Sequence, residues 1–115
     1  MTDTELARLV ERGEMPADGF SHERHLRVAL VFLDEAPTVA EAIARMSSML
    51  RRLTAAVGKA DKYSQPITDF WMYQLAAARA LMPSAPADAI FRAYPRLLDS
   101  TLAHQATDRR SPDPR

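Results

Sequence analysis

The chain has 115 residues, and its 15 basic and 15 acidic side chains give a formal net charge of zero. A balanced charge lacks the basic surface that nucleic-acid-binding domains carry, so we expect no nucleic-acid partner. Cysteine is absent, which excludes disulfides, thiol nucleophiles and cysteine-ligated zinc. No apolar run is long enough to span a bilayer, and the first residues do not form a secretory signal. We therefore expect a cytoplasmic protein with no membrane partner.

The composition favours helix. Hydrophobic residues make up 47% of the chain, and glycine occurs only 3 times. Alanine, leucine, arginine and methionine, which all suit helix interiors, are frequent. A chain of this length is one domain by default. We expect an all-α fold, a small single-domain bundle of four to six helices over residues 1–107, followed by a disordered C-terminal tail over residues 108–115.

The N-terminal part of the chain predicts two helices. The first begins at Thr2 or Asp3, either of which suits an N-cap, and it ends near Gly13. A loop marked by proline and glycine covers residues 15–19. The second helix covers residues 21–35, because its apolar positions recur at helical spacing up to a stopping proline.

The third expected helix has the clearest amphipathic pattern. It runs from a Thr38 cap to a C-terminus at Gly58. Its apolar residues alternate steps of four and three, and they are Val39, Ile43, Met46, Leu50, Leu53 and Val57. We expect Ile43, Met46, Leu50 and Leu53 to be buried against the second and fourth helices. The arginines off the stripe are expected to face solvent, and they are Arg45, Arg51 and Arg52.

The C-terminal half predicts further helices with short connections. A loop over residues 59–66 leads to a fourth helix that begins near Pro66 and ends near Met82. A fifth helix covers residues 87–94, and the proline that follows should kink or end it before helix resumes over residues 96–105. The sequence shows no alternation typical of strands.

The opening of the second helix carries two of the three histidines. Residues three apart share a helix face, so His22 and His25 should lie side by side at the N-terminal end of an apolar stripe. A neutral imidazole can serve as a base, an acid or a metal ligand near pH 7. The alternative is that both are half-buried structural histidines that bond to loop carbonyls.

Two short motifs resemble those of a known group of proteins. They are Phe20-x-His22-x-x-His25-Leu26 and Lys62-Tyr63-x-x-x-Ile67-Thr68-x-x-x-Trp71. The pattern resembles F-x-H-x-x-H-[LV] followed by K-Y-H-x-T-[IV]-T in small uncharacterised bacterial all-helical proteins. The resemblance covers about residues 20–75. It implies that His22, His25, Tyr63 and Thr68 meet in space.

This sequence departs from that pattern at two positions. Ser64 stands where the group has its third histidine, and Pro66 stands where it has a threonine. If that histidine is a ligand or a base in the group, its role is lost here or another residue supplies it.

These residues suggest a site between the second and fourth helices. An imidazole beside a tyrosine hydroxyl is a proton-transfer pair, so the catalytic candidates are His22, His25 and Tyr63. The candidate contacts to a small-molecule ligand are Lys62 for an anionic group, Thr68 as a polar contact and Trp71 as an apolar wall. Three of these residues have a structural alternative. Tyr63 could anchor the loop through its phenol, Thr68 could be a first-turn hydroxyl, and Trp71 could be a core side chain. No motif specifies a reaction class, so whether the chain is an enzyme stays open.

Metal binding is one alternative function. Two histidines at this spacing can chelate one ion, but a stable site needs a third or fourth ligand. The candidates are Glu23, Asp69 and His104. Glu23 points to another face of the helix, and the sequence does not place the other two, so we assign no metal ligand and no cofactor.

A non-catalytic interaction module is the other alternative. Several methionines fall on or beside helical stripes, and they are Met46, Met49, Met72 and Met82. Methionine suits adaptable cores and adaptable partner surfaces alike. A stripe left exposed by short helices would be covered in a homodimer.

Overall fold

The computed structural model describes residues 1–105, so the tail expected over residues 108–115 lies outside the described part. The described residues contain no strand, and the predicted all-α class is confirmed. In chain order the elements are α1 (Asp3–Glu11), α2 (His22–Glu35), α3 (Val39–Ala56), the 3-10 helix η1 (Ala60–Lys62), α4 (Gln65–Leu81), α5 (Ala87–Ala93) and the 3-10 helix η2 (Pro95–Leu98). One helical turn over residues 102–105 follows. In this part of the chain, no helix is both long and apolar enough to cross a membrane.

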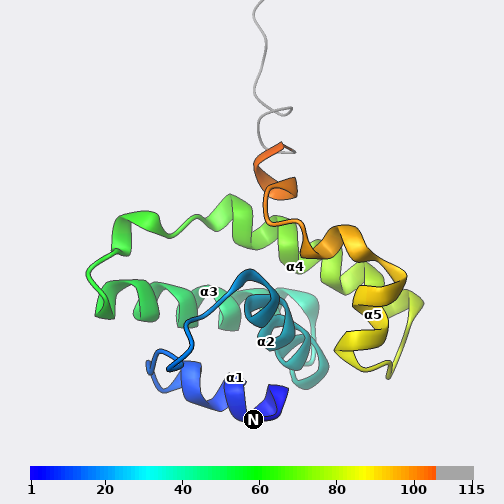
Figure 1. The fold of residues 1–115 in the computed structure, drawn as a ribbon, viewed down its shortest axis with the longest axis horizontal. Helices are drawn as coiled ribbons and strands as arrows, with labels where there is room; N and C mark the ends of the chain where they lie inside the picture. Colours follow the sequence, from blue (N-terminus) through cyan, green and yellow to red (C-terminus); the bar gives the residue numbers. More distant parts are fainter. Residues whose placement is uncertain (106–115) are drawn as a thin grey trace, which may run out of the picture.

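The second helix is the centre of the bundle. α2 contacts α1, α3 and α4, and α3 also contacts α4 and η1. In Figure 1, α1 and α4 lie on opposite sides of α2, and the segment after η2 rises beside α4. The connection through η1 reverses the chain, so the C-terminal end of α3 and the start of α4 frame one end of the bundle.

Hydroxyl side chains set the start of the first four α-helices. Thr2, Ser21, Thr38 and Ser64 each accept a hydrogen bond from the backbone N–H three residues later, at 3.0–3.3 Å. Such a cap satisfies one of the N–H groups that a helix leaves without a partner, and it stabilises the fold by about 1 kcal/mol. The caps at Ser21 and Ser64 begin α2 and α4 at the same end of the bundle, where the candidate residues lie.

The apolar stripe expected on α3 is buried in its middle and open at its ends. Met46, Leu50 and Leu53 are at most 9% exposed, whereas Val39 is 39% and Val57 46% exposed. Val39 is the first residue of α3 and Val57 its C-cap, so neither lies in the middle turns that α2 and α4 cover. The predicted burial is therefore confirmed for Met46, Leu50 and Leu53, whereas Ile43 is only partly buried against the core.

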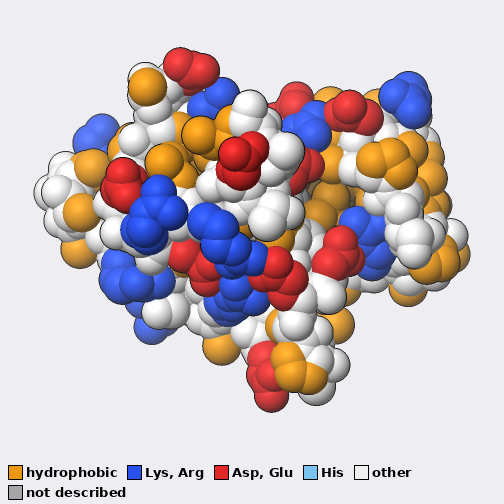
Figure 2. Space-filling view, turned by 90° about the horizontal axis from the view of Figure 1, so that it is seen from below, with side chains coloured by type: hydrophobic (Ala, Val, Ile, Leu, Met, Phe, Trp, Pro, Cys, Tyr) orange, Lys and Arg blue, Asp and Glu red, His pale blue; other side chains and the backbone are white. Residues whose placement is uncertain are grey.

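The expectation that Arg45 faces solvent is also wrong. Its side chain is 30% exposed, and its Nε lies 2.8 Å from Glu11 Oε2 while its Nη2 lies 2.9 Å from Glu35 Oε1. Its guanidinium carbon also sits 4.4 Å from the ring centroid of Phe32. Arg8 pairs with the same two carboxylates, so one charge network joins α1, α2 and α3. Figure 2 shows blue and red side chains packed together across this face.

Candidate functional site

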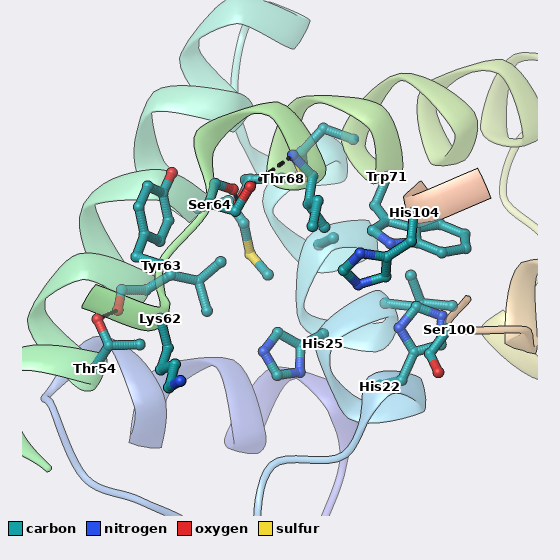
Figure 3. A pocket seen from close by; sticks show the side chains of 16 residues that line it. His22, His25, Thr54, Lys62, Tyr63, Ser64, Thr68, Trp71, Ser100 and His104 are labelled. Carbon is teal, nitrogen blue, oxygen red and sulfur yellow. Dashed lines mark hydrogen bonds between the residues drawn. The ribbon is translucent and has the colours of Figure 1, made fainter. Parts of the chain in front are cut away.

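A cavity of about 400 Å³ opens between α2, α3 and the junction of η1 with α4. Apolar side chains form most of its wall, including Leu26, Met46, Leu50, Ile67, Trp71 and Met72. Its polar lining comes from His22, His25, Thr54, Lys62, Tyr63, Ser64, Thr68, Ser100 and His104. The six residues proposed from the sequence as catalytic or ligand-contacting therefore all line one cavity (Figure 3).

All three histidines of the chain line this cavity. His22 and His25 come from the first turn of α2, and His104 comes from the helical turn after η2. The sequence named His104 without placing it, and it gave no signal for Ser100. Both reach the cavity because the last segment lies near His22, whose Nε2 bonds to the Leu97 carbonyl oxygen, and no local pattern encodes this contact.

His22 joins α2 to the C-terminal segment. Its Nε2 lies 2.9 Å from the carbonyl oxygen of Leu97. A carbonyl oxygen only accepts, so Nε2 carries the hydrogen, and in the neutral ring the lone pair is on Nδ1. The ring also meets Trp71 edge-on, with centroids 4.5 Å apart at an interplanar angle of 61°. These contacts hold the ring in one orientation.

His25 is oriented the other way round. Its Nδ1 lies 2.8 Å from the carbonyl oxygen of Ser21, so Nδ1–H donates and Nε2 carries the lone pair. Phe20 stacks on the ring, with centroids 4.0 Å apart and planes 20° from parallel. This is the contact of the residue before the N-cap with the first turn. Figure 3 shows the His25 ring pointing into the cavity.

Burial lowers the pKa of His25 below its ordinary value, because the charged imidazolium loses hydration. The bond to the Ser21 carbonyl offsets part of this effect, and the nearby His22 adds to the lowering. His25 is therefore a neutral imidazole at pH 7, with an unprotonated Nε2. That form is the one a general base requires.

Tyr63 lines the cavity with its ring rather than its hydroxyl. The hydroxyl donates to Gln65 Oε1 at 2.8 Å, and in Figure 3 it points away from His25. Gln65 in turn donates to Ser47 Oγ at 3.0 Å and to Asp69 Oδ1 at 2.8 Å. The phenol thus anchors the η1 segment to α3 and α4, and no direct proton-transfer pair with a histidine is formed.

The hydroxyls at the start of α4 are bonded within its first turn. Thr68 Oγ1 donates to the Ser64 carbonyl oxygen at 2.9 Å, and Ser64 Oγ accepts from the N–H of Ile67 at 3.3 Å. Thr68 is 8% exposed. The Thr68 oxygen can still accept a hydrogen bond from a ligand, but its hydrogen is already donated to the Ser64 carbonyl.

Lys62 and Trp71 differ in their surroundings. Lys62 is exposed, and no ion pair or side-chain hydrogen bond within residues 1–105 engages its ammonium group. Trp71 is 8% exposed and packs edge-on against Phe70, with ring centroids 5.1 Å apart. One residue therefore brings an unpaired charge to the cavity, and the other forms a rigid part of its wall.

Of the candidate third metal ligands, Glu23 and Asp69 have other partners, and His104 lines the same cavity as His22 and His25. Among the residues that the structure describes, no group of three or more histidine, aspartate or glutamate side chains is arranged to hold an ion. Glu23 forms an ion pair with Arg27 at 2.9 Å, and Asp69 bonds to Gln65. His22 and His25 each direct one ring nitrogen at a backbone carbonyl.

Comparisons with models of protein families, with curated proteins and with solved structures find no match. The resemblance suggested by the two motifs therefore stays a prediction. The class that fold and site define is a small helical bundle with a ligand-sized cavity, and its function is inferred from that cavity.

Proposed function

We propose that this protein binds a small molecule in the cavity between α2 and α4 and that His25 performs acid–base chemistry on it. The observation that carries the proposal is that all three histidines line one mostly apolar cavity of about 400 Å³. Ligand sites are typically cavities of about 300–1,000 Å³ with apolar walls and a few convergent polar groups. We also propose that the protein is cytoplasmic, as expected from the sequence.

His25 is the proposed base. Its Nδ1–H is held by the Ser21 carbonyl, and burial keeps the ring neutral by lowering its pKa. The Nε2 lone pair can then accept a proton from a ligand bound in the cavity. His22 has a positioning role in this scheme, because its Nε2–H is committed to Leu97.

The remaining candidates would shape and orient the ligand. Trp71 provides a flat apolar surface, and Thr68 offers a buried acceptor. Tyr63 contributes its ring, and its hydroxyl becomes a proton donor only after it rotates away from Gln65. The proposal therefore rests on His25 rather than on a histidine–tyrosine pair.

Trp71 allows a direct test, because it is the only tryptophan of the chain and lines the cavity. A fragment library is screened by the fluorescence of Trp71, and hits are tested for chemical conversion by mass spectrometry. The sharpest variant is His25→Asn, whose amide can replace the Nδ1–H donor to Ser21 but has no base at the Nε2 position. We expect it to fold and bind hits but to lose any conversion. Fluorescence that no fragment changes would contradict ligand binding in this cavity.

Self-association is a second candidate function. Tyr73 is 60% exposed and Leu81 71% exposed, both on α4. Leu81 also borders a groove between α4 and η2 that Phe70, Leu97 and Leu102 help to line. A homodimer would cover these side chains, and light scattering coupled to size-exclusion chromatography would show it. A dimer that Leu81→Glu dissociates would support this function.

A further inference from the structure

The charges around the cavity point to one class of ligand. Among the described residues that line it, Lys62 is a full cation, three are histidines, and none is aspartate or glutamate. The chain as a whole has as many acidic as basic residues, so the absence of acids from this lining is a local feature. An anionic group can enter this cavity without meeting a carboxylate on its wall.

The helices strengthen this local field. α2 and α4 both begin at the cavity, at the Ser21 and Ser64 caps. The N-terminal end of a helix carries a partial positive charge, and it favours anions within the first turn. The partial positive charges of the two helix ends add to the charge of Lys62. Together with the absence of carboxylates from the described lining, they favour an anionic ligand.

We propose that the natural ligand is a small apolar monocarboxylate whose carboxylate group lies between Lys62 and His25 and whose apolar body lies against Trp71. The proposal rests on the proposed function and specifies its ligand class. The exposed ammonium of Lys62 supplies one positive charge, which matches the single negative charge of a monocarboxylate. Met46, Leu50 and Ile67 offer an apolar surface to the rest of the molecule. In the view of Figure 3, Lys62 and His25 lie on the side of the cavity opposite Ser64 and Thr68.

Burial lowers the pKa of His25 and keeps its ring neutral in the free protein. A carboxylate that binds beside it favours the imidazolium, so ligand binding and proton uptake by His25 are linked, and in this complex the ring serves the acid half of its acid–base role. Affinity for a carboxylate should therefore rise as the pH falls from 8 to 6, while affinity for a neutral analogue should not.

The probes are octanoate and 3-phenylpropionate, each with its primary amide and its primary amine of equal chain length. Binding is followed by Trp71 fluorescence and by the NMR signals of the imidazole rings. We expect each acid to bind at least tenfold more tightly than its amide, and each amine to bind most weakly.

A matched pair of variants isolates the charge. Lys62→Met should remove most of the preference for acids, because it deletes the ammonium and keeps the aliphatic chain. Lys59→Met deletes the same charge three residues earlier, at an exposed position outside the cavity lining, and it should leave the preference unchanged.

The possible failures are distinguishable. Acids that bind no better than amides, or an acid preference that survives Lys62→Met, would overturn the monocarboxylate assignment while ligand binding itself stands. If the fluorescence of Trp71 is unchanged by the acids, the amides, the amines and the fragment library, both this assignment and the proposed function fail.

Discussion

The Nε2 atom of His22 lies 2.9 Å from the carbonyl oxygen of Leu97, which is 75 residues further along the chain. This bond ties the first turn of α2 to the end of η2. The residues just beyond Leu97 supply Ser100 and His104 to the cavity wall. The far wall of the cavity therefore depends on a side chain that the motif near the N-terminus provides.

We predict that His22→Ala loosens this wall. The Leu97 carbonyl then lacks its donor, and an unsatisfied partly buried group costs about 1–3 kcal/mol of the free energy of unfolding. Hydrogen exchange in residues 97–105 should become faster. His22→Gln is the matched control, because its amide nitrogen can replace Nε2. Equal exchange in wild type and His22→Ala would show that this bond does not hold the segment.

A pH titration tests His25. Its pKa is lowered in the folded protein, so below about pH 6.5 the unfolded chain binds the proton more readily than the folded one. The contribution of His25 to stability is therefore constant above this pH and is lost as the pH falls. Urea denaturation between pH 8 and 5.5 should show wild type losing stability relative to His25→Asn, and the neighbouring His22 is the same in both proteins. Parallel curves would mean that His25 protonates equally well in both states.

Tyr63→Phe removes only the hydroxyl that donates to Gln65. We expect a loss of about 1 kcal/mol in the free energy of unfolding, the usual net contribution of one hydrogen bond, because the η1 segment loses its anchor. The control is Tyr73→Phe, whose side chain is 60% exposed, and it should stay within about 0.5 kcal/mol of wild type. If Tyr63→Phe is as stable as this control, the Tyr63 hydroxyl does not anchor the η1 segment.

The loss of stability on shortening a side chain of α3 should depend on how deeply that side chain is buried. Leu50→Ala is expected to cost about 2–5 kcal/mol, as core truncations do, with the lower end favoured because Leu50 borders the existing cavity. Val57→Ala, on the same predicted stripe but 46% exposed, should change stability by about 0.5 kcal/mol or less. Thermal or urea denaturation of both variants measures the two losses of stability. Equal losses would show that the two ends of the stripe are covered in solution.

Local features of the chain could be predicted from the sequence. Ser21 and Thr38 cap the helices that their positions indicated, and the spacing of His22 and His25 placed both on one side of α2. These signals involve residues within one turn of each other, where helix geometry alone decides the contact.

Contacts between distant segments could not be predicted. Arg45 lies off the apolar stripe of its own helix, and only the packing of α1 brings Glu11 to it, 34 residues away in sequence. His104 reaches the cavity because the last segment packs near His22. The Tyr63 hydroxyl bonds to Gln65, and Gln65 is itself held by Ser47 of α3, 18 residues away in sequence.

The methionine methyl groups provide the most direct measurement of ligand binding in the cavity. Met46 and Met72 line it, whereas Met15 and Met82 do not. In a protein labelled with ¹³C at the methionine methyls, titration with a ligand found by the Trp71 screen should shift the signals of Met46 and Met72 with one common affinity, and those of Met15 and Met82 should stay in place. A ligand that shifts Met82 and leaves Met46 and Met72 unchanged would contradict the account.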